Sequence, residues 1–464
     1  MAHPDYGAVE RALLERWPET RLEPSLDRIR PLVNLLGDPH RACPVIHLAG
    51  TNGKTSTSRM VDALLRARGL RTGRYTSPHL QQMTERISID GAPLTEERFV
   101  RAYADVARYL EVVDRSGSHP VSYFEAMTGM AFAAFADAPV DVAVVEVGMG
   151  GSWDATNVVD AQVAVVTPVA VDHVAYLGDD PATIAAEKAG ILKPGSVGVL
   201  AQQEAEVAEV LLRKAAEVGA TVVREGLEFG VAERLPGVGG QVITLRGLDR
   251  EYDDVLLPLF GAHQANNAAC ALAAVETFVG GGAELDPEVV QEGFAAVTSP
   301  GRLEVVRRSP TIVLDGAHNP HGARATADAV QEAFSFSPLV GVIGVMQDKD
   351  VEGVLSAYEP VLAELVCSQA ATERALPAGD LADAATPLFG ADRVHVARRL
   401  DDAIDLAVEL AERGGSSGEG LGSGGVLITG SVITVGEART LLGVEPEVGP
   451  EADPENGGSA EEVQ

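Results

Sequence analysis

Short apolar runs alternate with segments of helical spacing along most of the chain. The first run, 44–48, precedes the helix-like segment VDALLRARG. Near 222–260 polar and apolar residues alternate instead, which predicts an antiparallel excursion. Elsewhere the alternation is typical of a mostly parallel β-sheet covered by helices on both faces. The later apolar runs lie at 141–148, 161–169, 197–200, 311–316, 340–346, 364–369 and 426–431.

Turn-forming and low-complexity segments divide this pattern. TSPG at 298–301 separates two blocks of strands and helices, so we expect an α/β protein with domains over 1–299 and 300–444. Within the second domain, RGGSSGEGLGSGG at 413–425 predicts a flexible insertion. Residues 445–464 contain seven acidic groups and no basic one, which indicates a disordered acidic tail.

Composition and charge exclude several classes of protein. The 464 residues carry 68 acidic and 36 basic side chains, a formal net charge of −32 that disfavours nucleic-acid partners. No stretch reaches about 18 uninterrupted apolar residues and residues 1–30 lack a signal-peptide core, so we expect neither membrane insertion nor secretion. Three cysteines without metal or redox spacing favour the cytoplasm. The chemistry of each lysine is worth asking about, because there are only five: Lys54, Lys188, Lys193, Lys214 and Lys349.

A candidate phosphate-binding loop follows the first strand. Glycines let backbone N–H groups close on a phosphate, Lys54 can reach the terminal phosphates and the Thr55 hydroxyl can meet a magnesium ion. The pattern G-x-x-x-x-G-K-[ST] would require glycine where Leu48 stands, so the loop is a shortened variant. The alternative is a glycine turn with an exposed lysine. The loop consists of Gly50, Thr51, Asn52, Gly53, Lys54 and Thr55.

Acidic and histidine side chains follow two later strands. Glu146 lies at the end of the run 141–148, and Asp172 and His173 follow the run 161–169. Because the carboxyl ends of parallel strands open into the crevice that binds ligands, we expect these side chains to face the same nucleotide. Carboxylate and imidazole can hold a divalent ion that bridges phosphates. The alternatives are a solvated acid at Glu146 and a loop cap at His173.

Eight segments in order closely resemble the bacterial folylpolyglutamate synthases, many of which also act as dihydrofolate synthases. This family belongs to the Mur ligase superfamily of ATP-dependent amide-forming enzymes. The resemblance implies an N-terminal P-loop ATPase-like, mostly parallel sheet flanked by helices and a smaller C-terminal Rossmann-like α/β domain. The segments are GTNGKT (50–55), YTSPHL (75–80), VVEVGMGGSWDATN (144–157), DHVAYLGDD (172–180), IAAEKAGILK (184–193), NAACALAA (267–274), PGRLEVV (300–306) and LDGAHNPHG (314–322).

The resemblance assigns ATP and metal sites. It makes 50–55 the ATP loop and implies magnesium binding by Ser77, Glu146 and His173. Lys188 matches a family lysine that is carbamylated, and addition of CO₂ would turn its cationic amine into an anionic ligand for a second magnesium ion. A potassium ion is a further candidate. From the residues alone, Ser77 lies in a Ser-Pro turn. Asp180 and Pro181 predict the N-cap and first residue of a helix, and Lys188 would lie in its last turn, where it would compensate the helix dipole.

The resemblance also places ligand contacts on both sides of the domain boundary. Since Arg302 and Asp315 follow that boundary, ATP would be gripped between two domains that close during catalysis. The alternatives are an interdomain salt bridge for Arg302 and a strand-end turn at Ser431. The implied contacts are Asn267, Arg302 and Asp315 for adenine and ribose, His318 and Asn319 near the phosphates and incoming glutamate, and Ser431 near the glutamate.

The pteridine site is the third site that the resemblance implies. Phe124 can stack on the pterin ring. Ser122 and Glu125 also form an S-x-x-E capping box, which we favour as the role of Glu125. Ser152 replaces the arginine of many relatives, so a contact to a folate carboxylate is lost or supplied elsewhere. The family positions are occupied by Ser122, Tyr123, Phe124, Glu125, Trp153, Asp154 and Ala155, and more loosely by 25–28.

The implied reaction joins L-glutamate to dihydropteroate or to the γ-carboxylate of a reduced folate. ATP phosphorylates the acceptor carboxylate, and the glutamate amine then displaces phosphate from the acyl phosphate. The resemblance assigns catalysis to Lys54, Lys188 and His318. We expect a monomer whose partners are these small molecules.

Two other functions compete with this interpretation. A muramyl-peptide ligase shares the chemistry and GTNGKT, but such enzymes usually carry a UDP-sugar domain before the loop, and Gly50 leaves too little room for one. An ATP-binding regulator without catalysis would leave Glu146, His173 and Lys188 without a purpose.

Overall fold

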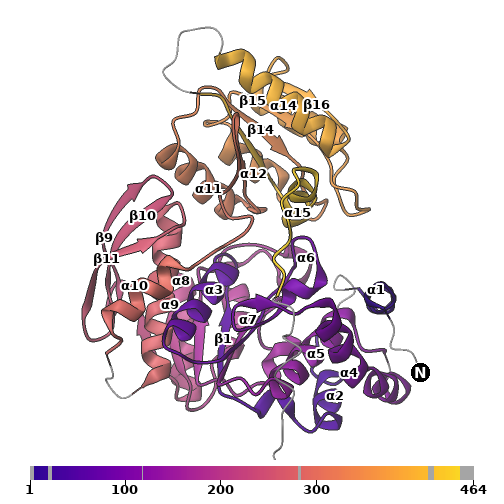
Figure 1. Ribbon diagram of the computed structural model, residues 1–464, viewed down its shortest axis with the longest axis vertical. Coiled ribbons are helices and arrows are strands. Elements are labelled where there is room, and N and C mark those ends of the chain that lie inside the picture. Colours follow the sequence, from indigo (N-terminus) through magenta and orange to yellow (C-terminus); the bar gives the residue numbers. More distant parts are fainter. Residues whose placement is uncertain (1–4, 19–22, 118, 281–283, 416–422, 450–464) are drawn as a thin grey trace, which may run out of the picture.

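The computed structural model contains two α/β lobes stacked along the long axis of the molecule, with a small antiparallel sheet at one side (Figure 1). Parts of the predicted insertion and tail, 416–422 and 450–464, lie outside the described residues. The bounds predicted for the insertion are corrected by the structure, because 413–415 end a helix and Gly425 begins a strand. Among the described helices, none combines the length and apolar character that a membrane span requires. The structure describes residues 5–18, 23–117, 119–280, 284–415 and 423–449.

The N-terminal lobe is built on an eight-stranded sheet with the order β4-β3-β2-β5-β1-β6-β7-β8. The strands from β2 to β8 in this order pair in parallel, and β3 and β4 pair antiparallel at one edge. Their bounds are β1 (Val45–Ala49), β2 (Thr72–Tyr75), β3 (Ile87–Ile89), β4 (Ala92–Pro93), β5 (Val142–Glu146), β6 (Val163–Val166), β7 (Val197–Leu200) and β8 (Thr221–Arg224).

Helices cover both faces of this sheet. Ile46 and Leu48 of β1 pack toward α3, α9 and α10, whereas Val45 packs toward α4 and α5. Because both faces are buried, β6 and β7 read as unbroken apolar runs, and so does β5 as far as Glu146. The helices are α1 (Tyr6–Leu14), α2 (Ile29–Leu35), α3 (Lys54–Ala67), α4 (Glu96–Ser116), α5 (Tyr123–Asp137), α6 (Val174–Leu177), α7 (Pro181–Lys188), α8 (Ala205–Val218), α9 (Ala262–Val279) and α10 (Pro287–Ala295).

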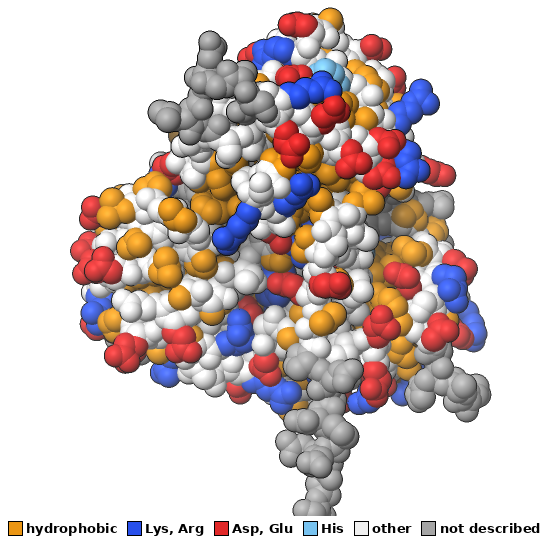
Figure 2. Space-filling view, turned by 45° about the horizontal axis from the view of Figure 1, so that its top comes forward, with side chains coloured by type: hydrophobic (Ala, Val, Ile, Leu, Met, Phe, Trp, Pro, Cys, Tyr) orange, Lys and Arg blue, Asp and Glu red, His pale blue; other side chains and the backbone are white. Residues whose placement is uncertain are grey.

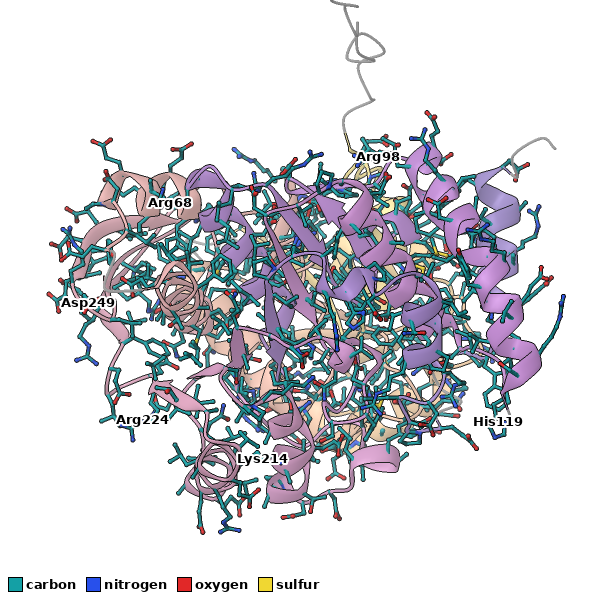
Figure 3. All side chains as sticks on the ribbon, turned by 90° about the horizontal axis from the view of Figure 1, so that it is seen from below. Arg68, Arg98, His119, Lys214, Arg224 and Asp249 are labelled. Atoms are coloured by element: carbon teal, nitrogen blue, oxygen red, sulfur yellow. The ribbon has the colours of Figure 1, made fainter. Side chains whose placement is uncertain are left out.

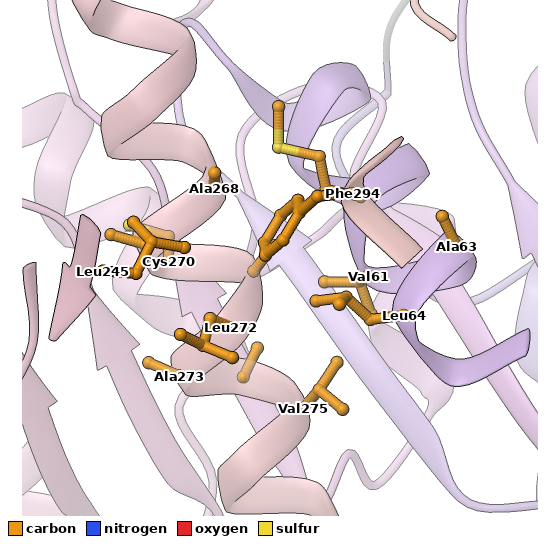
Figure 4. Packing of buried hydrophobic residues seen from close by; sticks show 14 of the residues in the cluster. Val61, Ala63, Leu64, Leu245, Ala268, Cys270, Leu272, Ala273, Val275 and Phe294 are labelled. Carbon is orange, nitrogen blue, oxygen red and sulfur yellow. The ribbon is translucent and has the colours of Figure 1, made fainter. Parts of the chain in front are cut away.

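The core beside the phosphate loop is packed by α3, α9 and α10. Phe294 of α10 lies between Val61 and Leu64 of α3 and the side chains of Cys270 and Leu272 on α9 (Figure 4). All five side chains are at most 1% exposed. This packing fixes α3, and with it the loop that precedes α3, against the rest of the lobe.

The predicted antiparallel excursion is confirmed, with a correction at its start. The strands β9 (Gly230–Gly237), β10 (Gly240–Arg246) and β11 (Glu251–Leu257) form a three-stranded antiparallel sheet. Residues 222–224 belong instead to β8, which pairs in parallel with β7. The side chains of 222–224 are only half-buried, so the sequence pattern does not identify β8 as the edge strand of the large sheet.

The C-terminal lobe repeats the pattern on a smaller scale. Its six-stranded sheet has the order β12-β13-β17-β14-β15-β16 and is parallel except for β12. The strands are β12 (Glu304–Arg308), β13 (Thr311–Leu314), β14 (Leu339–Ile343), β15 (Glu364–Cys367), β16 (Val394–Val396) and β17 (Gly425–Thr429). The helices are α11 (Pro320–Ala333), α12 (Val351–Tyr358), α13 (Ala378–Phe389), α14 (Leu400–Gly415) and α15 (Val432–Leu441). The predicted α/β class is confirmed.

The two parallel sheets turn the carboxyl ends of their strands toward each other. Loops after β1, β5 and β6 of the first lobe and after β13 and β14 of the second line one common cleft. Ligands bind at such carboxyl ends in open parallel sheets. Figure 2 shows the recess between the lobes, with basic and acidic side chains gathered around it.

Candidate active site

A cleft of about 930 Å³ lies between the lobes. It is large enough for a nucleotide together with a second ligand. The sequence-predicted residues that line it are Gly50, Thr51, Asn52, Gly53, Lys54, Thr55, Ser77, Glu146, His173, Lys188, Asn267, Arg302, Asp315, His318 and Asn319. Tertiary structure thus brings together side chains from both lobes.

The candidate phosphate-binding loop, residues 50–55 and here called the phosphate loop, is held against the residues that follow β6. The Thr51 N–H donates to the Pro168 carbonyl at 2.9 Å, and Thr51 Oγ1 donates to the Ala170 carbonyl at 2.8 Å. Gly53 has φ of 88°, and a Cβ atom there would lie 2.5 Å from Asn267 Oδ1. Only glycine satisfies both constraints at this position.

Lys54 opens α3 and folds back over the loop. Its Nζ donates to the carbonyls of Gly50 at 3.0 Å and Thr51 at 3.2 Å. Burial lowers the pKa of the Lys54 amine, whereas the charges of Glu146 and Asp172 oppose that shift. A phosphate group in the loop would add negative charge and favour the ammonium form.

Glu146 ends β5 beside the phosphate loop. Thr55 Oγ1 donates to both of its carboxylate oxygens, at 3.0 and 3.1 Å. Burial raises the pKa of Glu146 to about 7, although Lys54 and Thr55 favour its ionised form. A desolvated carboxylate of this kind is stabilised by a cation, so Glu146 is suited to hold a divalent ion.

Asp172, in the loop after β6, is where the two lobes meet in the cleft. It pairs with Lys349 Nζ at 2.5 Å, accepts from Asn319 Nδ2 at 3.1 Å and lies 3.3 Å from His318 Nε2. Burial opposes ionisation of Asp172, but the hydrogen bond and charge of His318 and other nearby cations hold the pKa of its carboxyl well below its usual range. An ionised carboxylate from one lobe therefore holds three side chains of the other.

The phosphate loop also contacts the second lobe directly. The side-chain amides of Asn52 and Asn319 pair reciprocally at 3.2 and 3.0 Å, and Asn52 Nδ2 lies 3.0 Å from His321 Nδ1. Asn319 also caps α11 by accepting the Gly322 N–H at 2.8 Å. One asparagine thus joins the phosphate loop, Asp172 and the start of α11.

His173 and Lys188 lie on the wall beside the phosphate loop. His173 has a left-handed backbone, with φ of 53°, and burial lowers the pKa of its imidazole to about 3. Lys188 is the last residue of α7, whose predicted start at Asp180 and Pro181 is confirmed. Burial, followed by the charge of Lys54, lowers the pKa of the Lys188 amine to about 7. Both side chains therefore have access to a neutral form at neutral pH.

Asp315 and Arg302 lie where the chain enters the second lobe. Asp315 accepts hydrogen bonds from the Leu303 N–H at 3.0 Å, the Ala317 N–H at 2.9 Å and Thr326 Oγ1 at 2.7 Å. Arg302 donates to the Gly301 carbonyl at 3.1 Å. Leu303 has φ of 47°, a rare value for a branched side chain, and its amide is held by Asp315. Asp315 therefore shapes the interlobe connection as well as lining the cleft.

The residues predicted to contact the pteridine lie outside the cleft lining. The capping box is confirmed: the Glu125 N–H donates to Ser122 Oγ at 3.2 Å and the Ser122 N–H to Glu125 Oε2 at 2.8 Å. The Glu125 carboxylate also pairs with Arg28 at 3.0 Å. Tyr123 begins α5 and is buried. The start of α5 is thus tied to the segment 25–28.

Phe124 and Asp154 support the loop after β5, which lines the cleft. A Cβ atom at Gly148 would lie 2.4 Å from the Phe124 ring, so the backbone passes directly over the ring. Asp154 accepts the Met149 N–H at 3.0 Å, and burial raises the pKa of its carboxyl to about 6. The same loop contains half-buried Trp153 and buried Ala155.

Ser431, predicted to lie near the glutamate, and Ser152, which replaces the arginine of many relatives, both form hydrogen bonds with backbone groups. Ser431 Oγ accepts from the Ile433 N–H at 3.0 Å and caps α15, whose first residue, Val432, lines the cleft. Exposed Ser152 donates to the Glu187 carbonyl at 3.1 Å, near the end of α7.

Lys349 was not predicted as a site residue. Its side chain is 7% exposed and comes from the loop after β14. The scarcity of lysine was the available signal, since Lys54, Lys188 and Lys349 all line the cleft. Lys214, by contrast, projects from α8 at the edge of the molecule (Figure 3). The described residues contain no group of three His, Cys, Asp or Glu side chains arranged to hold a metal ion.

Comparison with known proteins agrees with this geometry. The sequence models of two Mur ligase domains match the chain: the middle domain over 48–275 and the glutamate ligase domain over 301–432. A dihydrofolate synthase/folylpolyglutamate synthase of Mycobacterium tuberculosis is 52% identical over 458 residues, covering 95% of this chain and 94% of the relative.

Solved structures extend the likeness to the whole fold. Mycobacterium tuberculosis folylpolyglutamate synthase complexed with ADP is 52% identical, with a TM-score of 0.92 over 95% of this chain and 99% of that one. Escherichia coli FolC in complex with DHPP and ADP is 29% identical, with a TM-score of 0.83 over 96% and 99%. The chain therefore belongs to the Mur ligase family, among its dihydrofolate synthase/folylpolyglutamate synthases.

Proposed function

We propose that this protein is an ATP-dependent glutamate ligase that converts dihydropteroate to dihydrofolate and extends reduced folates with glutamate. The observation that carries this proposal is the cleft in which the phosphate loop of one lobe meets 315–319 of the other. Its relatives support the proposal: the Mycobacterium tuberculosis protein is named for both activities, and Escherichia coli FolC is seen with DHPP and ADP.

The reaction proceeds in two steps. An oxygen of the acceptor carboxylate attacks the γ-phosphorus of ATP, the bond to ADP breaks, and an acyl phosphate forms. The glutamate amine then attacks the acyl carbon, inorganic phosphate leaves, and the amine nitrogen loses a proton. Lys54 lies where it can stabilise the transferred phosphoryl charge. His318, held between the Gly316 carbonyl and the Asp172 carboxylate, is the candidate to stabilise negative charge on the phosphate or the incoming glutamate.

Magnesium fits the residues that face the phosphate loop. The desolvated Glu146 carboxylate calls for a cation, and the neutral His173 imidazole and the Ser77 hydroxyl supply further lone pairs. A bound magnesium ion would neutralise phosphate charge and polarise the transferred group. These three residues would hold the first ion, and potassium remains a further candidate in the same cleft.

Lys188 is the candidate for carbamylation. The free amine is the form that reacts with CO₂, and burial already lowers the pKa of Lys188 to about 7. The nitrogen bonds to the CO₂ carbon and releases one proton, which leaves an N-carboxylate. That group would hold a second magnesium ion in place of the buried amine.

The extent of carbamylation should rise with pH. With a pKa of about 7, roughly one tenth of the Lys188 amine is neutral at pH 6 and about nine tenths at pH 8. Protein equilibrated with ¹³C-bicarbonate should therefore show a carbamate carbon signal that is several-fold stronger at pH 8 than at pH 6. Lys188→Gln should abolish the signal and Lys214→Gln should retain it. A signal that survives in Lys188→Gln, or an unmodified Lys188 at every pH, would contradict the assignment.

The pteridine binds next to the loop after β5. Phe124 lies against Gly148, and the Asp154 carboxylate holds the Met149 amide, so both side chains act where the cleft wall turns. Ser122, Tyr123 and Glu125 set the start of α5 behind that wall, with Trp153 and Ala155 in the adjoining loop. Ser431 serves the glutamate site through the start of α15.

ADP release with magnesium, ATP and glutamate tests the function. We expect release with both dihydropteroate and tetrahydrofolate, and none when glutamate or the acceptor is omitted. Release with a single pteridine would reduce the proposal to one reaction. Release only with a UDP-muramyl peptide would overturn the folate assignment, and nucleotide binding without acceptor-dependent release would overturn catalysis.

The same proposal includes the oligomeric state and the cellular location of the enzyme. A cleft completed by the two lobes of one chain needs no second copy, which supports a monomer. Cys43, Cys270 and Cys367 are free thiols, which favours the cytoplasm.

A further inference from the structure

The chain crosses between the lobes at two adjacent places. The first crossing is the connection 296–303 between α10 and β12. The second is the segment 443–449, here called the strap, which leaves α15 and returns to the N-terminal lobe. Figure 1 shows the strap in yellow running down from α15 between the lobes. The sequence placed 445–449 in a disordered tail, and the ordered contacts of this stretch correct that prediction.

Glu447 fastens the strap to α3. Its carboxylate forms two hydrogen bonds with the Arg59 guanidinium, at 2.7 and 3.2 Å, and accepts a third from Thr298 Oγ1 at 3.2 Å. The Arg59 and Glu447 side chains are 14% and 29% exposed. Bidentate pairing fixes orientation as well as distance. Because Thr298 lies in the first crossing, this contact ties both crossings to the same helix.

A second set of contacts holds the other end of the strap. Gln81, beside the loop after β2, donates from Nε2 to the Val444 carbonyl at 2.9 Å and accepts from Arg439 Nε at 2.9 Å. Arg439, on α15, also pairs with Glu304 at the start of β12. The glycine at position 436 of α15 is packed so tightly that a Cβ atom there would lie 1.9 Å from the Leu80 carbonyl.

The end of the strap reaches the far side of the N-terminal lobe. A Cβ atom at Gly449 would lie 2.2 Å from the Pro93 carbonyl, next to Thr95, the cap of α4. Figure 3 shows the last described residues emerging beside Arg98 of the same helix. The strap thus spans from α15 across α3 to the start of α4.

We propose that Glu447 and Arg59 are positioning residues that restrain the rotation of the glutamate-ligase lobe against the phosphate loop. With a single crossing, the second lobe could rotate about the connecting segment. Two crossings fixed side by side permit only a hinge closure about the line that joins them. Arg59 follows Lys54 by five residues, about 7.5 Å along α3, so the restraint acts close to the loop. The other end of α15 is capped by Ser431, and its first residue, Val432, lines the cleft.

The inference rests on the proposed function only for its kinetic test. In Glu447→Gln, which keeps the shape of the side chain but removes its charge, kcat/KM for glutamate should fall about tenfold. The dissociation constant of AMPPCP should rise by less than this, because the phosphate loop is unchanged and only the contacts from Arg302 and Asp315 depend on the second lobe. The matched control is Glu445→Gln: in the part of the chain described, the exposed Glu445 carboxylate has no hydrogen bond or ion pair, and its variant should behave as wild type.

An interlobe distance measurement tests the restraint without activity. Spin labels are placed at Lys214→Cys on α8 and Arg399→Cys in the second lobe, in a Cys43→Ser background where Cys270 and Cys367 are buried. The distance distribution should broaden in Glu447→Gln and narrow again in the charge-swapped pair Glu447→Arg with Arg59→Glu. A distribution as narrow as wild type in Glu447→Gln would overturn the proposal. So would an equal loss of AMPPCP affinity, since that would make Glu447 a support of α3 alone.

Discussion

Replacing Lys54 by methionine should lower kcat about a thousandfold. The Lys54 ammonium group contacts the Gly50 and Thr51 carbonyls and is the cationic side chain of the phosphate loop. Its charge acts on the phosphoryl group as negative charge redistributes during transfer, so the loss should fall more on kcat than on the KM for ATP. Steady-state ADP release with tetrahydrofolate and glutamate measures both constants.

The control for this variant is Lys214→Met. Lys214 lies on the outer helix α8 and pairs only loosely with Glu217, at 3.9 Å. Removing it changes the net charge by the same amount as removing Lys54, so equal losses in the two variants would point to a global charge effect. A decrease in kcat of less than tenfold in Lys54→Met would refute the role assigned to Lys54.

Replacing Lys349 by methionine should lower kcat/KM for glutamate about a hundredfold. The Lys349 ammonium and the Asp172 carboxylate are 7% and 6% exposed and come from different lobes. Without Lys349, Asp172 becomes a buried carboxylate with fewer counter-charges, and its pKa should rise. The closed arrangement of the lobes then loses stability relative to open ones, and glutamate, which needs both lobes, binds less well.

Arg374→Met is the matched control for Lys349→Met. Arg374 pairs with Asp348 at 3.4 Å, next to Lys349, but both side chains are exposed, at 48% and 38%. Exposed ion pairs contribute about 0 to 1 kcal/mol, so this variant should keep kcat/KM within a few-fold of wild type. In a double-mutant cycle, Asp172→Asn with Lys349→Met should lose less than the sum of the single losses. Additive losses would show that the two residues act separately.

Local patterns predicted most of the secondary structure and the candidate site residues on the N-terminal lobe. The phosphate loop, the cap of α7 at Asp180 and the capping box at Ser122 are all set by residues within a few positions of each other, and each lies where expected. The order of strands was not predictable, because β1 pairs with β5 and β6 and not with its neighbours in sequence.

The predicted strand ends explain why Glu146 and His173 were found and Lys349 was missed. Glu146 and His173 directly follow apolar runs, and parallel strands deliver such residues to one edge. Lys349 follows a run as well, but no motif marks it, and its partner Asp172 lies 177 positions earlier. The chain alone gives no reason to join those two positions.

By itself the sequence determined the α/β class, the candidate phosphate loop, the family and the residues that carry its motifs, because these depend on short-range spacing and on local hydrophobicity. Tertiary structure decided which groups face each other across the cleft. Asn52 meets Asn319 over 267 positions and Arg59 meets Glu447 over 388. Contacts at such separations depend on how the two lobes pack against each other. The free energy of that packing is spread over many residues, and the local sequence around each residue does not identify its partner.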